Sequence, residues 1–342
     1  MIGRESRIAV IGAGAIGGIV AALVRKGGHD VEIVCKHPDL AQRIQSRGLH
    51  VTGAKGDFSV SMPAVAEIGE MQGTKDVVFL ATKATAMLEA ARRLQPLLGE
   101  ESVVVSLQNG ICEPALAEIL GRGRVIGCVV GWGATMHAPG ELEMTSTGEF
   151  VIGNIDGKPD PRLASLQGIM NAVLPTRISE CILSELYSKL IVNACITSLG
   201  ALCGLTMGEM LASKQARSLF IAVMREAIDV AEASNLSVAP YGGKLDYYRF
   251  LGPGGFIGDL RRHLVIRAIG FKYRRLTSSS LQSLQRGQKT EIDWLNGYIC
   301  DEGRRLGVAT PINDRIVEMI HEIEAGKRRI AVENFQDGAL NL

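Results

Sequence analysis

The sequence predicts a two-domain α/β protein, in which a doubly wound parallel sheet is followed by a mostly α-helical domain. Three observations lead to this prediction. Short β-branched runs alternate with helical patterns over the first half, a glycine-rich turn separates the first such run from the first helix, and strand patterns stop beyond about residue 180. The length of 342 residues is also more than one ordinary core uses. We expect a first domain over 1–178 and a second over 179–342.

The elements of the first domain follow from unalternated apolar runs, which are typical of parallel strands buried on both faces. We expect strands at 7–12, 30–35, 76–81, 102–106 and 125–130, and helices at 15–26, 40–48, 84–98 and 113–120. The segment 140–154 indicates a hairpin or edge strands, and a short helical piece follows Pro161. Strand-helix repetition of this kind favours a doubly wound sheet.

The second domain shows helical spacing almost throughout, at 182–203, 213–233, 290–306 and 314–324. The apolar run from Leu190 to Met207 contains Asn193, which favours a core helix over a membrane span. Near the N-terminus, glycines interrupt the run Ile8–Val24, which argues against a signal peptide. We therefore expect a cytoplasmic protein without a membrane partner.

Composition narrows the class of partner. Thirty-seven basic and 36 acidic side chains leave a net charge of +1, so no global field attracts nucleic acid. The 46% of hydrophobic residues excludes a mainly disordered chain. Seven scattered cysteines form no Cys-x-x-Cys pair, and we expect buried thiols and no metal site. A small-molecule partner is the expectation, and a homodimer stays open.

A glycine motif follows the first predicted strand and opens the first helix. It consists of Gly12, Ala13, Gly14, Ala15, Ile16 and Gly17, the G-x-G-x-x-G pattern of Rossmann-type dinucleotide sites. Gly12 would make the tight turn, Gly14 would let a pyrophosphate approach the backbone, and Gly17 would let helix and sheet pack closely. The phosphates would bind at the helix N-terminus. The alternative is a glycine-rich turn without a ligand.

The end of the second strand distinguishes NAD from NADP. An NAD site usually places an acidic residue there, about 20 residues past the glycines. Lys36 stands at this point, and Glu32 lies too early, within the strand. Because a cation suits a 2′-phosphate, we predict NADP(H), unless Lys36 is merely exposed.

Polar residues follow two further predicted strands. Lys83 comes after DVVFLAT, and Asn109 comes after SVVVSLQ. Ligands bind at the C-terminal edge of parallel sheets, so we expect both at a site. Each also has a simpler interpretation, a solvated lysine and an Asn-Gly turn.

Lys189 and Asn193 are four residues apart in an otherwise apolar helix, so they share one face. Hydride delivery to a ketone creates an alkoxide that must take up a proton, and a positioned ammonium can supply it and stabilise the developing charge. The alternative is a lysine that reaches the helix edge. Farther on, Glu291 starts a helix, and it either stabilises the helix dipole or binds cofactor or substrate.

The assembled motifs resemble the ketopantoate reductase (2-dehydropantoate 2-reductase) family. They are the glycine motif, Lys83, LQNG at 107–110, KLxxNA at 189–194 and TEIDxxNGYI at 290–299, in order along nearly the whole chain. The resemblance implies NADPH-dependent reduction of a 2-oxo acid, with 2-dehydropantoate and (R)-pantoate the leading pair, in pantothenate biosynthesis. It also implies a Rossmann-type domain joined to a helical domain.

Position by position, the resemblance implies a role for each matched residue. Gly12–Gly17 and Lys36 bind the dinucleotide, and Lys83 and Asn109 lie by the nicotinamide and the reacting centre. Lys189 is the general acid, Asn193 and Ser279 bind the substrate, and Glu291 serves both cofactor and catalysis.

Two departures weaken the substrate assignment. Thr197 and Met207 stand where the family commonly has asparagines that address the substrate, and we expect Thr197 to line the substrate site instead. The basic stretch Arg261–Arg275 is either a solvated helical face or a binding surface for a larger anion or a neighbouring subunit. A reductase of another branched or aromatic 2-oxo acid, and a non-catalytic NADP(H)-sensing protein, therefore remain alternatives.

Overall fold

The computed structural model describes residues 2–340, which divide into two compact units. Within the described residues, the first unit consists of 2–108 with Cys112–Leu186, and the second consists of Asn109–Ile111 with 187–340. Helix α6 (Ile182–Cys203) begins in the first unit and continues into the second. The short segment Asn109–Ile111 thus packs with a unit other than that of the strand before it.

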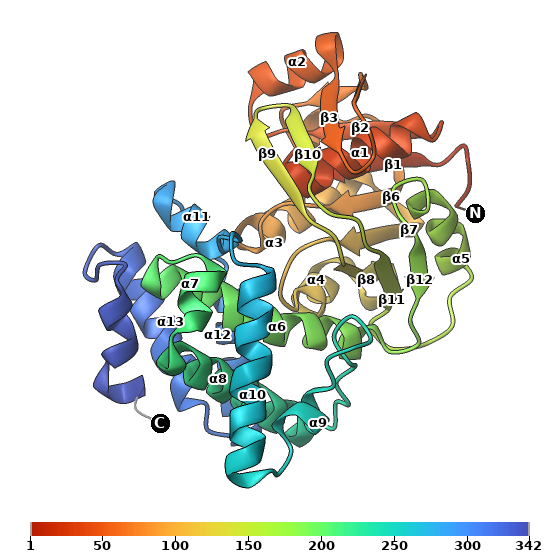
Figure 1. The fold of residues 1–342 in the computed structure, drawn as a ribbon. Helices are drawn as coiled ribbons and strands as arrows, with labels where there is room; N and C mark the ends of the chain where they lie inside the picture. The colour runs from red at the N-terminus through yellow and green to blue at the C-terminus, as the bar shows by residue number, and fades with distance from the viewer. Residues whose placement is uncertain (1, 341–342) are drawn as a thin grey trace. The chain divides into compact units, whose positions relative to one another are not determined.

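The main sheet of the first unit has eight strands in the order β12-β11-β8-β7-β6-β1-β2-β5 (Figure 1). The strands from β8 to β5 are all parallel, and β11 runs antiparallel to β8. Their bounds are Arg7–Ile11 (β1), Asp30–Val34 (β2), Ala64–Val65 (β5), Lys75–Leu80 (β6), Leu98–Ser106 (β7), Val125–Val130 (β8), Phe150–Asn154 (β11) and Thr176–Ile178 (β12). The chain leaves β1 on one side and returns on the other through β6, so the strand order reverses between these two strands. Ligands of open α/β sheets bind at such a reversal.

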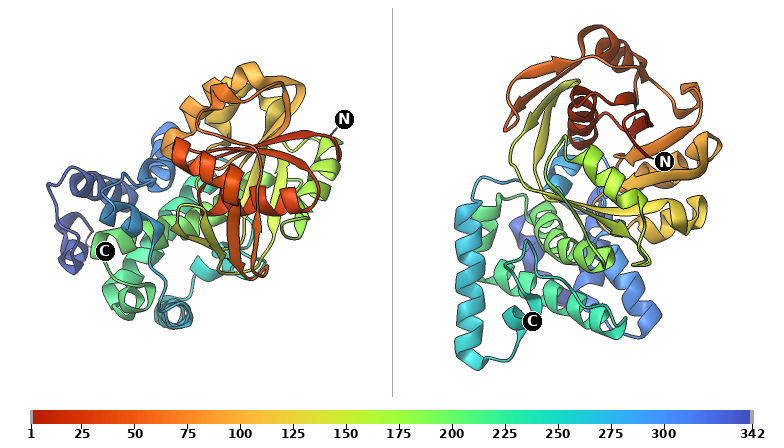
Figure 2. Two further views of the ribbon diagram at one scale, coloured as in Figure 1. Left: turned by 90° about the horizontal axis from the view of Figure 1, so that it is seen from above. Right: turned by 90° about the vertical axis from the view of Figure 1, so that its right-hand side faces the viewer.

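Helices cover both faces of this sheet, as a doubly wound fold requires. They are α1 (Ala15–Lys26), α2 (Pro38–Arg47), α3 (Ala84–Leu94), α4 (Glu113–Leu120) and α5 (Arg162–Met170). Figure 2 shows α1 on the face opposite α3. The fully buried apolar residues of β1, β2 and β6 pack with α1 into one core, which includes Ile8, Ile33 and Phe79. The predicted fold class is confirmed.

A second, four-stranded sheet packs against α1 and was not predicted. It has the order β4-β3-β10-β9, with bounds Leu49–Gly53 (β3), Phe58–Val60 (β4), Ala134–Ala138 (β9) and Glu141–Met144 (β10). A Cβ at Gly18 of α1 would lie 2.5 Å from Leu142 Cδ1 of β10, so this glycine permits the close approach.

Neither interpretation of the segment 140–154, a hairpin or edge strands, is correct, because β10 lies between β3 and β9 and β11 lies between β12 and β8. β10 pairs with β9 across the turn at Gly140, and β11 joins the main sheet beside β8. Local alternation identified both strands, but the partner of a strand depends on distant residues that alternation does not report.

The second unit is helical, as expected. Its helices are α6, α7 (Met207–Ala212), α8 (Lys214–Ala233), α9 (Tyr247–Leu251), α10 (Gly255–Lys272), α11 (Ser279–Gln285), α12 (Asn296–Leu306) and α13 (Pro311–Glu324). The predicted helix over 290–306 is confirmed over Asn296–Leu306 and wrong over 290–295, where a 3₁₀ turn, η4 (Ile292–Trp294), precedes α12. Helices α7, α9 and α11 were not predicted. Helix α10 was anticipated only in part, as the solvated helical face that was one interpretation of Arg261–Arg275.

By length and composition alone, helix α6 could cross a membrane. However, 78% of its most apolar 18-residue segment is buried inside the protein. The prediction of a core helix is therefore confirmed. Six of the seven cysteines are buried as expected, and Cys181 is exposed.

Candidate active site

The glycine turn of the first unit has the geometry that its sequence predicts. Gly12 has a φ of +112°, and a Cβ there would lie 2.8 Å from the Ala81 carbonyl oxygen at the end of β6. A Cβ at Gly17 would lie 2.1 Å from the Gly12 carbonyl oxygen. Both positions therefore require glycine for the turn and for the close packing of α1 on the sheet.

Gly14 differs from its two neighbours, because a Cβ there would meet nothing within 4 Å. Gly14 is the N-cap of α1, and among the described residues no side chain caps this helix start. The first turn also contains no acidic residue. Open space, uncapped N–H groups and the positive end of the helix dipole fit a pyrophosphate of a dinucleotide. The side chain of Ala13 belongs to the buried core and that of Ile16 packs against this core.

The two charged residues near the end of β2 have different surroundings. Glu32 forms an ion pair with Lys75, with 2.6 Å between Oε2 and Nζ, and both side chains are largely buried. Lys36 is exposed directly after β2, between the buried Cys35 and the start of α2. Glu32 is therefore already paired within the first unit, whereas Lys36 is an exposed cation beyond the end of this strand.

Lys83 and Asn109 fall into different units. Lys83 is exposed and is the N-cap residue of α3 in the first unit, directly after the Thr82 that follows β6. Asn109 belongs to the second unit. Gln108, just before it, accepts a hydrogen bond from Ser106 Oγ at 2.8 Å and stays with the first unit.

Helix α6 has one narrow accessible face, and two polar residues lie on it. In the fully described stretch from Leu186 to Cys203, every position is buried except Lys189, Val192, Asn193 and Ile196, which are partly exposed. These positions recur at intervals of three and four residues, so they form one stripe along the helix. The ammonium group of Lys189 and the amide of Asn193 thus share the single accessible face of this stretch.

The Asn-Gly turn packs beside this stripe. Asn193 Nδ2 donates a hydrogen bond to Asn109 Oδ1 at 3.4 Å. Gly110 has a φ of +88°, and a Cβ there would lie 2.2 Å from the Trp294 carbonyl oxygen. Trp294 in turn donates its backbone N–H to the Glu291 carbonyl oxygen at 3.0 Å. Residues of the LQNG, KLxxNA and TEIDxxNGYI motifs, which are far apart in the sequence, therefore lie close together within the second unit.

Ser278 and Ser279, at the start of α11, lie next to α6 farther along the helix. A Cβ at Gly200 would lie 2.9 Å from Ser278 Cβ, so the glycine allows α11 to start next to α6. Ser278 is the N-cap, and its Oγ accepts a hydrogen bond from the Leu281 N–H at 3.1 Å. Ser279 is the first residue of α11 and is exposed, so its hydroxyl is accessible.

The two residues that stand where the ketopantoate reductase family commonly has asparagines, Thr197 and Met207, are both buried. Thr197 is buried, and its hydroxyl donates to the Asn193 carbonyl oxygen at 2.8 Å. Met207 is buried at the start of α7, where its N–H donates to the Leu276 carbonyl oxygen at 2.9 Å. Thr197 keeps only its hydroxyl lone pairs for a substrate, and Met207 offers an apolar side chain.

Sequence reasoning missed a buried polar chain behind α6. Asn296 Nδ2 donates to the Ala194 carbonyl oxygen at 3.3 Å and to Asn313 Oδ1 at 2.9 Å. Glu226 accepts hydrogen bonds from the backbone N–H groups of Ile312 and Asn313 and from Asn313 Nδ2. Burial raises the pKa of Glu226, and these hydrogen bonds oppose that rise. The asparagine of the NGYI segment was the available clue, because a buried amide needs partners.

The comparisons with known proteins agree with both units. The family model described as "Ketopantoate reductase PanE/ApbA" matches residues 8–157, and the one described as "Ketopantoate reductase PanE/ApbA C terminal" matches residues 182–324. The chain is 29% identical over 350 residues to a 2-dehydropantoate 2-reductase of Mesorhizobium japonicum, covering 96% of this chain and 98% of the relative. It is 28% identical to the enzyme of the same name from Aquifex aeolicus, covering 91% and 94%.

Solved structures show the same fold. A PanE/ApbA family ketopantoate reductase from Ralstonia eutropha is 29% identical, with a TM-score of 0.80 over 94% of this chain and 100% of that chain. A D-mandelate dehydrogenase, solved with NADH and anilino(oxo)acetate, is similar in fold at 22% identity, with a TM-score of 0.79 over 94% and 99% of the two chains.

Proposed function

This chain belongs to the ketopantoate reductase family, and from that membership we propose that it reduces 2-dehydropantoate to (R)-pantoate with NADPH. The observation that carries the proposal is the stripe of α6, where Lys189 and Asn193 share one accessible face beside Asn109. An enzyme with this activity would act in the cytoplasm, in the route to pantothenate.

The first unit supplies the dinucleotide site. The backbone N–H groups at the start of α1 would hold the pyrophosphate, and Gly14 leaves the space for it. Lys36 would pair with the 2′-phosphate, which distinguishes NADPH from NADH. Lys83 would lie by the nicotinamide. When bound, the dinucleotide supplies the hydride for the carbonyl carbon.

The second unit supplies the proton and the orientation. The Lys189 ammonium donates a hydrogen bond to the ketone oxygen and transfers a proton to it as negative charge develops, so that the product is a neutral alcohol. Asn193 and Asn109 orient the substrate, and the accessible hydroxyl of Ser279 meets its carboxylate. Glu291 would contact the cofactor or a substrate hydroxyl close to the Gly110 turn, and Thr197 would line the site through its hydroxyl oxygen.

A panel of 2-oxo acids tests the proposal. We expect NADPH-dependent reduction with the highest kcat/KM for 2-dehydropantoate, compared with straight-chain, branched and aromatic 2-oxo acids. A higher kcat/KM for a branched or aromatic acid would contradict the substrate and retain the reaction class. NADPH binding without consumption across the whole panel would contradict the enzyme activity itself.

A further inference from the structure

Helix α10 presents an apolar face to solvent. Six large apolar side chains along it are between 37% and 84% exposed, namely Phe256, Ile257, Leu260, Leu264, Val265 and Phe271. We refer to these six residues as the α10 stripe. The opposite side of α10 is buried through Arg262, Ile266 and Gly270, so the orientation of the helix is fixed by its own unit. Figure 2 shows α10, drawn in cyan, at the outer edge of the helical unit.

The exposed area is larger than a monomer normally leaves open. A large apolar side chain presents roughly 150–200 Å² when it is fully exposed. The α10 stripe therefore offers on the order of 600–700 Å² of apolar surface. The largest patch of most monomers is about 300–600 Å², and a standard interface buries about 800 Å² on each partner. The stripe alone nearly supplies one side of such an interface.

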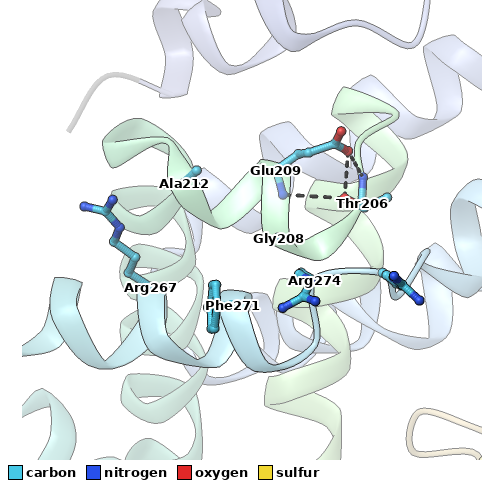
Figure 3. Close-up of a pocket in the computed structure, with 8 residues that line it drawn as sticks. Thr206, Gly208, Glu209, Ala212, Arg267, Phe271 and Arg274 are labelled. Carbon is cyan, nitrogen blue, oxygen red and sulfur yellow. Dashed lines mark hydrogen bonds between the residues drawn. The ribbon is translucent and has the colours of Figure 1, made fainter.

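A cavity lies at the C-terminal end of the same helix. It has a volume of about 730 Å³ and is open between α7 and α10, with Gly208, Ala212, Arg267 and Phe271 among its lining residues (Figure 3). The two helices cross closely here, because a Cβ at Gly270 would lie 2.7 Å from Leu211 Cβ. The stripe thus has a hollow at one end and its most exposed side chains, Phe256 and Ile257, at the other.

We propose that the α10 stripe binds the α10 stripe of a second copy of this chain, antiparallel, about a two-fold axis near Leu264. Leu264 is midway between Phe256 and Lys272, so the axis brings the start of one helix to the end of the other. At about 100° per residue, Phe256 lies on the same side of Leu264 as Arg267 and Phe271, which line the cavity. Phe256 of each copy therefore enters the cavity of the partner.

The shape of this face favours a second copy over an anionic membrane. The cavity at one end of the α10 stripe matches the exposed Phe256 at the other end, whereas contact with a membrane needs no such match. Arg267, Arg274 and Arg275 line the cavity together with Glu209. In a dimer the aliphatic parts of these arginine side chains pack against the entering Phe256, and their charged ends point to the solvent at the cavity mouth.

Light scattering coupled to size exclusion, with the full chain at micromolar concentration, tests the proposal. We expect twice the chain mass of 36.6 kDa for the wild type. Leu264→Glu should weaken dimerisation by about 100-fold or more, since it places a charge at the centre of the interface. Val332→Glu changes an apolar residue with 42% exposure elsewhere in the second unit and should remain a dimer.

A cysteine variant tests the axis itself. Leu264→Cys should form a disulfide-linked dimer on mild oxidation, whereas the wild type, with the exposed Cys181, and Val332→Cys should not. A monomeric wild type, a dimer that Leu264→Glu leaves intact, or a wild type that stays monomeric and binds vesicles containing phosphatidylserine would each overturn the proposal.

Discussion

The glycine turn of the first unit and the α6 stripe of the second are built in opposite ways. The turn is a local feature, because Gly12, Gly14 and Gly17 act through the side chains that they lack, within six consecutive residues. The stripe carries Lys189 and Asn193, but it becomes a site only when distant segments reach it, as Asn109 does. A site made of backbone can be inferred from a short motif, and a site made of converging side chains depends on the whole fold.

The largest expected effect on stability separates the two kinds of glycine within the turn. Gly17→Ala places a methyl group 2.1 Å from the Gly12 carbonyl oxygen, so the unfolding free energy should fall by about 3 kcal/mol. Gly14→Ala meets nothing within 4 Å, so its thermal stability should be unchanged, yet NADPH binding should weaken by about 10- to 100-fold. Calorimetry and fluorescence titration measure both. Equal NADPH affinity in Gly14→Ala and wild type would show that the pyrophosphate does not approach this residue.

A smaller effect on stability is expected at Glu226, in the polar chain behind the accessible face of α6. Glu226→Gln puts an amide NH₂ against the donors of Ile312 and Asn313, which should cost about 1–3 kcal/mol of unfolding free energy at neutral pH. Glu232→Gln, exposed on the same helix, is the matched control and should change it by less than about 0.5 kcal/mol.

The same variant changes the pH dependence of stability. Burial raises the folded pKa of Glu226 above its ordinary value of 4.5, so the wild type loses stability as the pH rises through that raised value. Because glutamine does not titrate, this loss should be absent from urea melts of Glu226→Gln. Identical pH profiles for the two proteins would mean that Glu226 has the same pKa in the folded and unfolded states.

The smallest effect concerns the choice of dinucleotide at the edge of the first unit. Lys36→Ala should lower kcat/KM for NADPH by about tenfold, roughly 1.4 kcal/mol, and leave that for NADH unchanged, because the 2′-phosphate is the only difference. Lys55→Ala removes another exposed lysine of the first unit and should affect neither. A parallel loss with both dinucleotides would assign Lys36 to a part of the cofactor that they share.

Sequence patterns predicted the helices whose ends are set by neighbouring residues. The bounds of α1 and α4 were predicted to the residue, because strand ends, glycines and prolines delimit them. The pairing of β10 with β9 depended on contacts that no local pattern contains. For α10, the sequence indicated only that Arg261–Arg275 could form a solvated helical face. Its apolar residues lie on the exposed side as well as at the buried Ile266, so they mark no single buried face.

In the candidate site, too, contacts within one helix could be predicted, and contacts between helices could not. Lys189 and Asn193 could be chosen together because four residues of helix place them on one face. We could not predict the hydrogen bond from Asn296 to the Ala194 carbonyl oxygen, or the further hydrogen bonds that lead to Glu226. These residues come from different helices, and no local sequence pattern shows how those helices pack.

We propose that the first unit binds the dinucleotide and that Lys189 of the second unit donates the proton. Single-turnover reduction of 2-dehydropantoate by Lys189→Ala, measured beside its NADPH dissociation constant, tests it most directly. We predict a rate at least about 10³-fold lower than that of the wild type, an NADPH affinity within about threefold, and wild-type values for the exposed control Lys327→Ala. An undiminished rate in Lys189→Ala would contradict the claim.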